Sequence, residues 1–245
     1  MKKKYKDNTK KNKFFAHLVT TLLVVLFFVF LCFFTYHIYS INNKEVPTIK
    51  KLFDCWKIQD YQNVYDISGQ ILDTDSFNNR VLMFRGYSAF FLALSQTDIS
   101  VVQNFLDESI NSLRVAMINC PKKFLSQIYY MLGKTYFHKN VVSDYHYYSD
   151  LSVKYLQLAQ SLGYKSSDIP EYLGLSYAEL GLAEESIKSF TEALLVRESD
   201  ELLLAIAQQY YNCQKANTAK QYLNKINQES SNELLVLKSR ILLAQ

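Results

Sequence analysis

Residues that interrupt regular structure are scarce in this chain, because its 245 residues include only 6 glycines and 3 prolines. Two of the prolines, Pro121 and Pro170, stand where helices are expected to begin. Asp168 and Glu171, on either side of Pro170, have the spacing of an N-terminal capping box. No run shows the sustained alternation of a strand bounded by turn residues. The chain is therefore predicted to be all-α.

Motifs for catalysis and for metal binding are also missing. The sequence has no glycine-rich phosphate loop, no G-x-S-x-G and no H-E-x-x-H. Its 4 cysteines form no C-x-x-C pair, and Cys55, Cys120 and Cys213 are an odd number that favours buried small apolar residues over a closed disulfide set. His138 and His146 have no second pair of ligands near them. We therefore expect no catalytic residues, no cofactor and no metal site, so the chain is not expected to be an enzyme.

The net charge of +4 comes from the N-terminus. Residues 1–13 hold seven lysines against one aspartate, and the rest of the chain has 20 basic and 22 acidic residues. A basic isoelectric point that arises from one short tail gives no reason to expect nucleic-acid binding. We interpret the lysines as an orientation signal that also contacts anionic lipid headgroups.

An apolar stretch follows this tail. Residues 14–43 contain no formally charged residue, and residues 18–39 are long enough, as a helix, to cross the roughly 30 Å hydrocarbon layer of a membrane. Tyr36 and Tyr39 stand at its far end, where an aromatic belt belongs. The stretch therefore predicts a transmembrane helix.

The positions of the lysines predict its orientation. They are more numerous before the apolar stretch than after it, and the positive-inside rule places the lysine-rich side in the cytoplasm. We expect a basic cytoplasmic tail over 1–13, a signal-anchor helix over 14–40, a linker over 41–47 and an extracytoplasmic remainder. Frequent Lys, Asn, Ile, Tyr and Phe indicate an AT-rich genome, so the inner (cytoplasmic) membrane of a bacterium is the expected location.

A cleaved signal peptide is the alternative interpretation of the apolar stretch. Its apolar region normally has about 7–15 residues and ends at a small-x-small site. Here the stretch is longer, no Ala-x-Ala follows it, and bulky Leu31 precedes Cys32 where a lipoprotein signal needs a small residue. The pattern favours an uncleaved anchor that contacts the lipid bilayer through residues 14–40.

Residues 170–198 carry a pattern of small and aromatic residues. The pattern consists of Leu173, Gly174, Tyr177, Gly181, Ser186, Phe190 and Ala193. Small Gly174 and Ala193 let two antiparallel helices approach closely, while Tyr177 and Phe190 fill the wedge toward the next pair. Gly181 takes the positive φ that ends the first helix. This stretch resembles one tetratricopeptide (TPR) repeat, a helical hairpin that buries its apolar face only by stacking.

The register recurs at about the 34-residue period of that family. The matching positions after this repeat are Leu203, Ile206, Ala207, Tyr210, Ala219, Leu223 and Ile226, and a helix with Leu237 and Ile241 is expected to cap the stack. Before it, the first-helix positions are Tyr129, Leu132, Gly133 and Tyr136, and earlier Leu82, Gly86, Ala89 and Phe90. Their second helices, with Ser152, Leu156 and Ala159 and with Ser109, Leu113 and Ala116, follow after overlong connections.

The resemblance implies an α-solenoid of TPR-like helical hairpins over 48–245. Its repeats are degenerate over 48–125, where the first pair surrounds Trp56, and clearer over 126–233, and a capping helix covers 234–245. A generic helical bundle would show the same apolar spacing. The recurrence of small and aromatic residues at matched places favours the repeats.

In the TPR family, partners bind along the first helices, at the second, fifth, ninth, twelfth and thirteenth positions of each repeat. By the register of Gly86, Gly133, Gly174 and Ala207 these positions hold Arg80, Met83, Tyr87, Phe90 and Phe91; Gln127, Tyr130, Lys134, Phe137 and His138; Asp168, Glu171, Leu175, Ala178 and Glu179; and Glu201, Leu204, Gln208, Tyr211 and Asn212. The partner-binding residues that we predict are Tyr130, Lys134, Phe137, His138, Glu171, Glu201, Gln208 and Tyr211.

The implied groove is aromatic toward its N-terminal end and acidic toward its C-terminal end. Only Lys134 fits the clamp with which some TPR proteins hold acidic chain ends, so an apolar or mildly basic segment is the expected partner. The alternative for each aromatic residue is packing against the neighbouring repeat.

Two functions remain open from the sequence. The first is a membrane-anchored scaffold that binds protein or peptide partners on the extracytoplasmic side of the membrane, where tethering makes weak contacts sufficient. The second is a helical accessory of an envelope transporter that holds a small apolar ligand. An open groove favours the first, and an aromatic-lined pocket of several hundred Å³ favours the second.

Overall fold

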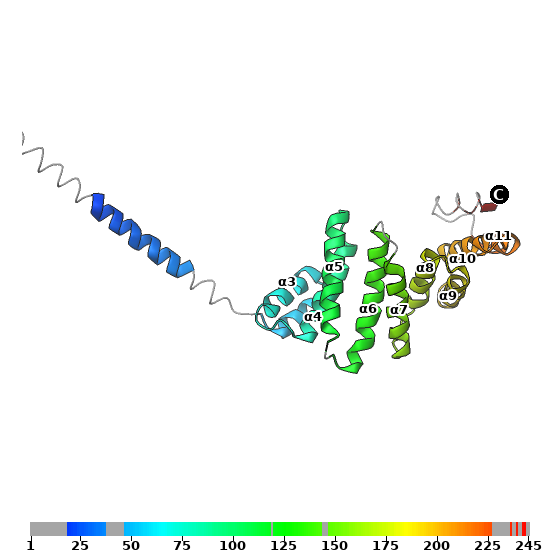
Figure 1. The fold of residues 1–245 in the computed structure, drawn as a ribbon, viewed down its shortest axis with the longest axis horizontal. Coiled ribbons are helices and arrows are strands. Elements are labelled where there is room, and N and C mark those ends of the chain that lie inside the picture. The colour runs from blue at the N-terminus through cyan, green and yellow to red at the C-terminus, as the bar shows by residue number, and fades with distance from the viewer. Residues whose placement is uncertain are drawn as a thin grey trace, which may run out of the picture. The chain divides into compact units, whose positions relative to one another are not determined.

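The computed structural model describes residues 19–37, 47–118, 120–143, 147–226, 236, 239 and 242–243. The chain divides into two compact units, Met1–Val46 and Pro47–Gln245. Every regular element among the described residues is an α-helix (Figure 1). The all-α prediction is confirmed for this part of the chain.

The described part of the first unit is one helix, Val19–His37. An 18-residue window within it has a mean hydropathy of 2.5, and at 1.5 Å per residue the helix is about 28 Å long. By length and composition it is able to cross a membrane, a test that a signal sequence near an N-terminus also passes. The basic tail, residues 14–18, Tyr39 and the linker as far as residue 46 lie outside the described residues.

The described part of the second unit contains ten helices. They are α2 (Ile49–Lys57), α3 (Tyr61–Leu72), α4 (Asn79–Leu94), α5 (Ile99–Ala116), α6 (Lys122–Val141), α7 (Tyr148–Ser161), α8 (Ile169–Glu179), α9 (Ala183–Val196), α10 (Asp200–Asn212) and α11 (Ala216–Leu223).

These helices pack as successive pairs. Helix α2 pairs with α3, α4 with α5, α6 with α7, α8 with α9 and α10 with α11, and the second helix of each pair also contacts the first helix of the next (Figure 1). First helices meet across pairs, because α4 contacts α6 and α6 contacts α8. The predicted α-solenoid of helical hairpins is confirmed. The capping helix, with Leu237 and Ile241, lies largely outside the described residues.

Three glycines explain how closely the helices of a pair approach. A Cβ atom added at Gly174 would lie 2.5 Å from Cδ1 of Phe190 on α9. At Gly133 and Gly86 the added atom would lie 2.6 Å from Cγ of Leu156 and of Leu113, respectively. Helices α4, α6 and α8 therefore each present a bare backbone patch on which a large side chain of the second helix packs, as the repeat pattern predicts.

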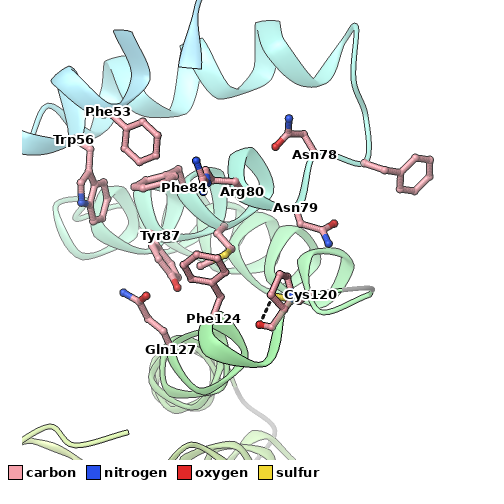
Figure 2. A pocket seen from close by; sticks show the side chains of 13 residues that line it. Phe53, Trp56, Asn78, Asn79, Arg80, Phe84, Tyr87, Cys120, Phe124 and Gln127 are labelled. Atoms are coloured by element: carbon pink, nitrogen blue, oxygen red, sulfur yellow. Dashed lines mark hydrogen bonds between the residues drawn. The ribbon is translucent and has the colours of Figure 1, made fainter. Parts of the chain in front are cut away.

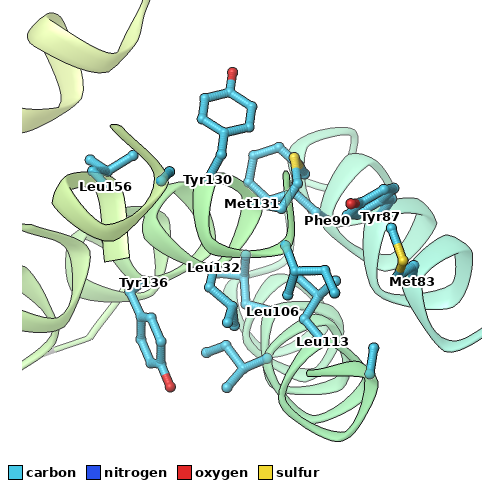
Figure 3. Close-up of a cluster of buried hydrophobic side chains, with 14 of the residues drawn as sticks. Met83, Tyr87, Phe90, Leu106, Leu113, Tyr130, Met131, Leu132, Tyr136 and Leu156 are labelled. Atoms are coloured by element: carbon cyan, nitrogen blue, oxygen red, sulfur yellow. The ribbon is translucent and has the colours of Figure 1, made fainter. Parts of the chain in front are cut away.

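Interlocking side chains continue this packing along the stack. The largest buried apolar cluster runs from α4 to α8 and includes Phe90, Leu113, Leu132 and Leu156, each 0% exposed (Figure 3). Smaller clusters lie among α2, α3 and α4 and among α9, α10 and α11. Phe190 of α9 joins the α8–α9 pair to the α10–α11 pair, since it covers Gly174 and packs with Leu202 and Ile206 of α10. Each repeat is thus held by the packing within its own pair and by contacts with its neighbours.

The capping box predicted at the start of α8 is wrong. Asp168 has helical dihedral angles and its side chain makes no cap hydrogen bond. Thr48, Asp60, Asn78, Asp98 and Ser199 do cap their helices, each accepting a hydrogen bond from a backbone N–H of the first turn. The carboxylate of Asp168 has other partners, which belong to the site described below.

The overlong connection predicted after Phe90 is also wrong. Helix α4 continues to Leu94 and α5 begins at Ile99, so the extra residues lengthen the two helices instead of the loop. After α6 the prediction is partly right, since this helix extends to Val141 and α7 begins only at Tyr148. A family spacing fixes the period of a repeat but not how the extra residues divide between helix and loop.

Candidate functional site

Four of the predicted partner-binding residues come together on α6. Tyr130, Lys134, Phe137 and His138 occupy one face of this helix, as their spacing requires. The face meets α8 and the residues just before it. Tyr130 Oη donates to Asp168 Oδ2 over 2.7 Å, and Lys134 Nζ lies 2.9 Å from the same oxygen.

The charges of this cluster stabilise one another. Burial works to raise the pKa of Asp168, but hydrogen bonds from Ser166, Tyr130 and Lys134 outweigh it and hold that pKa below its ordinary value. Burial raises the pKa of Tyr130, so its hydroxyl stays protonated and donates. The Asp168 carboxylate is therefore ionised at neutral pH, and its contacts with Tyr130 and Lys134 tie α6 to the start of α8.

Aromatic rings surround the ammonium group of Lys134. Its Nζ lies 5.7 Å from the ring centroid of Phe90, 5.2 Å from that of Tyr130 and 4.9 Å from that of Tyr172. Rings at such distances attract a cation through their negative faces. Because the three rings come from α4, α6 and α8, this one cation connects three successive pairs.

His138 is a neutral member of the same cluster. Burial, and then the nearby charge of Lys134, lower its pKa to about 4. Its ring lies 5.4 Å from that of Phe90, and its Nε2 is 3.3 Å from the hydroxyl of Tyr172. His138 is thus an aromatic packing residue between α4 and α8 at neutral pH.

The remaining predicted residues lie elsewhere in the solenoid. Glu171 of α8 forms an ion pair with Arg197 at 3.1 Å. Glu201 is exposed in the first turn of α10, where a backbone N–H and then the Ser199 hydroxyl lower the pKa of its carboxyl. Gln208 donates to Asn212 over 3.1 Å, also on α10. These residues are acidic and polar side chains of the kind that the sequence predicts toward the C-terminal end of the groove.

Tyr211 is separate from the α6 cluster. It is 38% exposed and lines a hollow of about 200 Å³ between α10 and α11, together with Leu242. The structure therefore joins four of the eight predicted residues and distributes the other four over α8 and α10. The partner-binding role of all eight stays a prediction. Tyr130, Phe137 and His138 have the contacts with neighbouring repeats that the alternative interpretation describes.

A larger pocket lies at the N-terminal end of the solenoid. It has a volume of about 680 Å³ and is bounded by α2, α4 and the start of α6 (Figure 2). Its lining consists of Phe53, Trp56, Phe77, Asn78, Asn79, Arg80, Met83, Phe84, Tyr87, Cys120, Pro121, Phe124 and Gln127. We call it the α2–α4–α6 pocket.

Part of this pocket was foreseen. Arg80, Met83, Tyr87 and Gln127 stand at the binding positions that the register implies. The α2 residues Phe53 and Trp56 were missed, because α2 has no glycine or alanine to set the register of the first pair. A usable signal was present, since two aromatic residues three positions apart share one face of a helix.

Aromatic contacts run from this pocket along the first helices. Neighbouring ring centroids lie between 5.2 and 6.1 Å apart in the order Trp56, Phe91, Phe90, His138, Phe137, Tyr172. We call this series the aromatic row. It crosses α2, α4, α6 and α8, and all of its members except Phe90 are partly exposed. Within the described part of the chain, no three His, Cys, Asp or Glu side chains gather where they could hold a metal ion.

Solved structures of TPR proteins resemble this fold. YrrB, described as a TPR protein with an unusual peptide-binding site, matches with a TM-score of 0.61 and 16% identity over 85% of this chain and 97% of its own. The AMB-1 form of MamA in the C2221 crystal matches with a TM-score of 0.58 and 20% identity over 79% and 95% of the two chains. The MSR-1 form of MamA matches with a TM-score of 0.56 and 19% identity over 80% and 94%.

No protein-family model matches the chain, and neither does any curated protein. At these identities the likeness to solved structures is a likeness of fold. The fold is that of a TPR solenoid.

Proposed function

We propose that this chain is a membrane-anchored scaffold that binds an extended segment of a partner protein along the first helices of its solenoid. The anchor is the apolar helix within residues 14–40, and the solenoid lies on the extracytoplasmic side of a bacterial inner membrane. The lysine-rich tail and the uncharged helix Val19–His37 support this arrangement.

The observation that carries the proposal is the aromatic row. Partly exposed aromatic rings supply much of the binding energy in protein interfaces, because they bury a large apolar area with few rotatable bonds. Here they follow one another over four first helices, which is the length scale of an extended peptide rather than of one side chain. YrrB, whose fold is similar, is described as having a peptide-binding site, which is consistent with binding by this fold.

Site-specific crosslinking in the cells that produce the protein tests the proposal. A photoreactive amino acid replaces Phe137 in the aromatic row, and in a second variant it replaces Glu192, which is exposed on the second helix α9. We expect a crosslinked partner from position 137 and none from position 192. Crosslinks of equal yield from both positions, or from position 192 alone, would contradict binding along the first helices.

A second candidate function is the small-ligand accessory of an envelope transporter. The observation that favours it is the α2–α4–α6 pocket, whose volume of about 680 Å³ falls within the range of about 300–1,000 Å³ typical of small-molecule sites. Six of its lining side chains are aromatic. The two functions are compatible, because the pocket occupies only the N-terminal end of the aromatic row.

A further inference from the structure

Five cations gather where the first helices of the first three pairs begin. Lys50 and Lys51 are in the first turn of α2, Arg80 is in the first turn of α4, and Lys122 and Lys123 open α6. All five side chains are exposed. Among the described residues, none of the five has a carboxylate within ion-pair distance.

The three helix starts are neighbours in the fold. Asn79 Nδ2 donates to the backbone oxygen of Ile118 over 2.8 Å, which joins the start of α4 to the connection before α6. The Arg80 guanidinium lies 5.8 Å from the ring centroid of Phe53, which is one turn along α2 from Lys50 (Figure 2).

Two apolar side chains project beside these cations, since Phe77 is 77% exposed and Ile118 is 60% exposed. They lie in the connections that lead into α4 and α6. Exposed apolar side chains beside cations are the combination that binds the surface of an anionic membrane. We call the surface that these residues form the basic edge; it consists of Lys50, Lys51, Phe77, Arg80, Ile118, Lys122 and Lys123.

The four lysines are at positions that do not favour their own helices. The start of a helix has a partial positive charge, so carboxylates stabilise the first turn and cations destabilise it. In the described helices α2 and α6, the first turn holds no acidic residue, and α6 has no side-chain cap. Positive charge that the helices do not need indicates an anionic partner outside the solenoid.

The excess of positive charge is confined to this part of the solenoid. Within the described residues, the basic edge has two exposed carboxylates beside it, Asp73 and Asp75, so five cations face two carboxylates for a net charge of +3. Farther along, the sign reverses, because Glu171 is in the first turn of α8 and Asp200 and Glu201 are in that of α10.

The opposite edge of the same three pairs is acidic. It is formed where the two helices of a pair are joined, and it carries Asp60, Asp98 and Asp150. Its exposed Lys57 is paired with Asp54 at 3.3 Å. An anionic surface would therefore attract the basic edge and repel the opposite one.

The basic edge is also where the chain from the apolar helix enters the solenoid. Residues 38–46 join the helix Val19–His37 to Pro47, and a chain of this length spans at most about 35 Å when it is fully extended. Helix α2 begins two residues after Pro47, at Ile49. If the apolar helix spans the membrane as proposed, the start of α2 stays near the lipid headgroups, so weak contacts with them suffice.

We infer that the basic edge docks on the anionic phospholipid surface of the membrane that the apolar helix spans. The five cations contact headgroup phosphates, and the side chains of Phe77 and Ile118 enter the boundary between headgroups and acyl chains. This inference rests on the membrane anchor of the proposed function and adds the surface by which the solenoid meets the bilayer.

Docking at this edge is compatible with binding along the aromatic row. Trp56, Phe91 and Phe137 lie toward the last turns of α2, α4 and α6, whereas the basic edge lies at the starts of these helices. A partner can therefore reach this part of the row while the edge contacts lipid.

Lipid crosslinking from matched positions tests the inference. Photoreactive benzoylphenylalanine replaces Ile118 at the basic edge or Ile99 at the opposite edge, whose side chains are 60% and 63% exposed. In a third variant it replaces Phe28, within the apolar helix Val19–His37. The full chain is placed in nanodiscs of phosphatidylcholine, or of equal parts phosphatidylcholine and phosphatidylglycerol. Mass spectrometry of the irradiated, intact protein measures the lipid adducts.

Two sets of substitutions test the role of charge. The edge variant exchanges Lys50, Lys51, Lys122 and Lys123 for Gln, and the control variant exchanges the exposed Lys154, Lys188, Lys215 and Lys220 for Gln. The edge variant should stay folded, because it removes cations from the starts of two helices. Circular dichroism checks this.

We expect phosphatidylglycerol adducts at position 118, few adducts at position 99, and adducts at position 28 in both kinds of nanodisc. Each cation near an anionic surface strengthens binding about fivefold, so the edge variant should lower the yield at position 118 by about tenfold or more. The control variant should leave that yield unchanged. Added salt should lower the yield at position 118 but not at position 28, because salt screens the headgroup charge.

Equal yields at positions 118 and 99 would overturn the inference. A yield at position 118 that is the same in both kinds of nanodisc, or in the folded edge variant, would overturn the assignment to anionic lipid. Adducts at position 28 with none at position 118 would overturn the docking and leave the anchor in place. No adducts at position 28 would overturn the anchor, and the inference with it. In cells, a protein adduct at position 118 in place of a lipid adduct would assign the edge to a protein partner and overturn the inference.

Discussion

Tyr87 and Tyr130 are buried tyrosines on first helices, and their hydroxyl groups have opposite surroundings. The hydroxyl of Tyr87 has no partner among the described residues, whereas that of Tyr130 donates to the ionised Asp168. Removing a buried hydroxyl that has no hydrogen bond removes the free-energy cost of its desolvation. Removing a buried hydroxyl that has a hydrogen bond leaves its partner buried without one, which lowers stability.

Exchanging each of these tyrosines for Phe should therefore change stability in opposite directions. We expect Tyr87→Phe to raise the free energy of unfolding by about 1 kcal/mol and Tyr130→Phe to lower it by about 1–3 kcal/mol. Urea denaturation of the full chain in nanodiscs, followed by Trp56 fluorescence, measures both. A loss of stability in Tyr87→Phe would show that its hydroxyl has a partner in solution.

His138 predicts how stability depends on pH. The pKa of this residue is about 4 in the folded chain and near 6.5 when unfolded, so between these values the unfolded state binds a proton that the folded state does not. The contribution of neutral His138 to the free energy of unfolding is complete above pH 6.5. It is lost as the pH falls toward 4, by up to about 3 kcal/mol. Asp168, whose pKa is lowered, contributes a further loss only below its ordinary value of 3.8.

One substitution isolates the contribution of His138 to the pH dependence of stability. His138→Gln cannot titrate, so the difference in unfolding free energy between wild type and variant should shrink or change sign between pH 7 and pH 5. Urea denaturation at the two values measures it. A difference that stays constant with pH would mean that His138 is solvated and titrates normally in the folded chain.

At the scale of the helical elements, the close approach of the two helices of a pair depends on positions of the first helix that carry no side chain. Gly174 faces the ring of Phe190. This ring is 1% exposed and is held on both sides, so it has no room to move. Gly69 on α3 faces the guanidinium of Arg85, whose Nη1 would lie 2.8 Å from an added Cβ. This guanidinium donates to Tyr65 and pairs with Glu108. The two glycines thus form a matched pair of helix-interior positions.

Gly174→Leu should be among the most disruptive single changes in the chain. Overpacking of this kind costs about 1–3 kcal/mol or more, and a side chain at this position must separate α8 from α9. Gly69→Ala should destabilise much less than Gly174→Leu, because the helix preference of Ala over Gly, about 1 kcal/mol, offsets part of the cost of displacing the Arg85 guanidinium from Tyr65. Thermal unfolding followed by circular dichroism compares them, and a mild effect of Gly174→Leu would contradict the tight pair.

The pairing of helices was predictable from particular residues, and the details of their ends were not. Gly86, Gly133 and Gly174 identified the first helices because a small residue has a packing reason at a fixed place. The capping box failed because the carboxylate of Asp168 is bound by Tyr130 and Lys134, which are 38 and 34 residues away in sequence. No pattern of neighbouring residues in the sequence shows that Tyr130 and Lys134 compete with the helix N-terminus for this carboxylate.

The α2–α4–α6 pocket shows the same limit. Arg80, Met83, Tyr87 and Gln127 were placed by register, but a hollow exists only where side chains from three elements fail to fill the space between them. The sequence predicted an aromatic N-terminal end of the groove, and the structure shows there a pocket lined by six aromatic side chains, one of which, Tyr87, has a buried hydroxyl without a hydrogen-bond partner among the described residues. A pocket of this kind can be identified only from residues that are neighbours in the folded structure.

At the scale of the whole molecule, charge and apolarity are divided along the chain. Seven lysines precede the uncharged helix, while the remainder has 20 basic and 22 acidic residues. The described helices of the solenoid are held by their own buried clusters. In the proposed topology, the charge asymmetry of the N-terminal region is the feature that orients the membrane-spanning helix.

The mature protein should therefore keep its N-terminal tail. If residues 14–40 form an uncleaved anchor, the N-terminal peptide of the membrane-extracted protein should include residues 1–13, which mass spectrometry of the intact chain measures. A mature product that begins near Ile41 would replace the anchor with a signal peptide and release the solenoid from the membrane.

Orientation follows from the same asymmetry. A reporter enzyme that is active only outside the cytoplasm should work when fused after Gln245 and fail when fused before residue 14, because the positive-inside rule keeps the lysine-rich side in the cytoplasm. Exchanging the seven lysines of the tail for Gln removes the charge difference and leaves the helix Val19–His37 unchanged, so reporter activity should then appear at both ends or reverse. Activity only at the N-terminal fusion of the wild type would place the solenoid in the cytoplasm. Unchanged orientation in the Gln variant would show that the lysines do not set it.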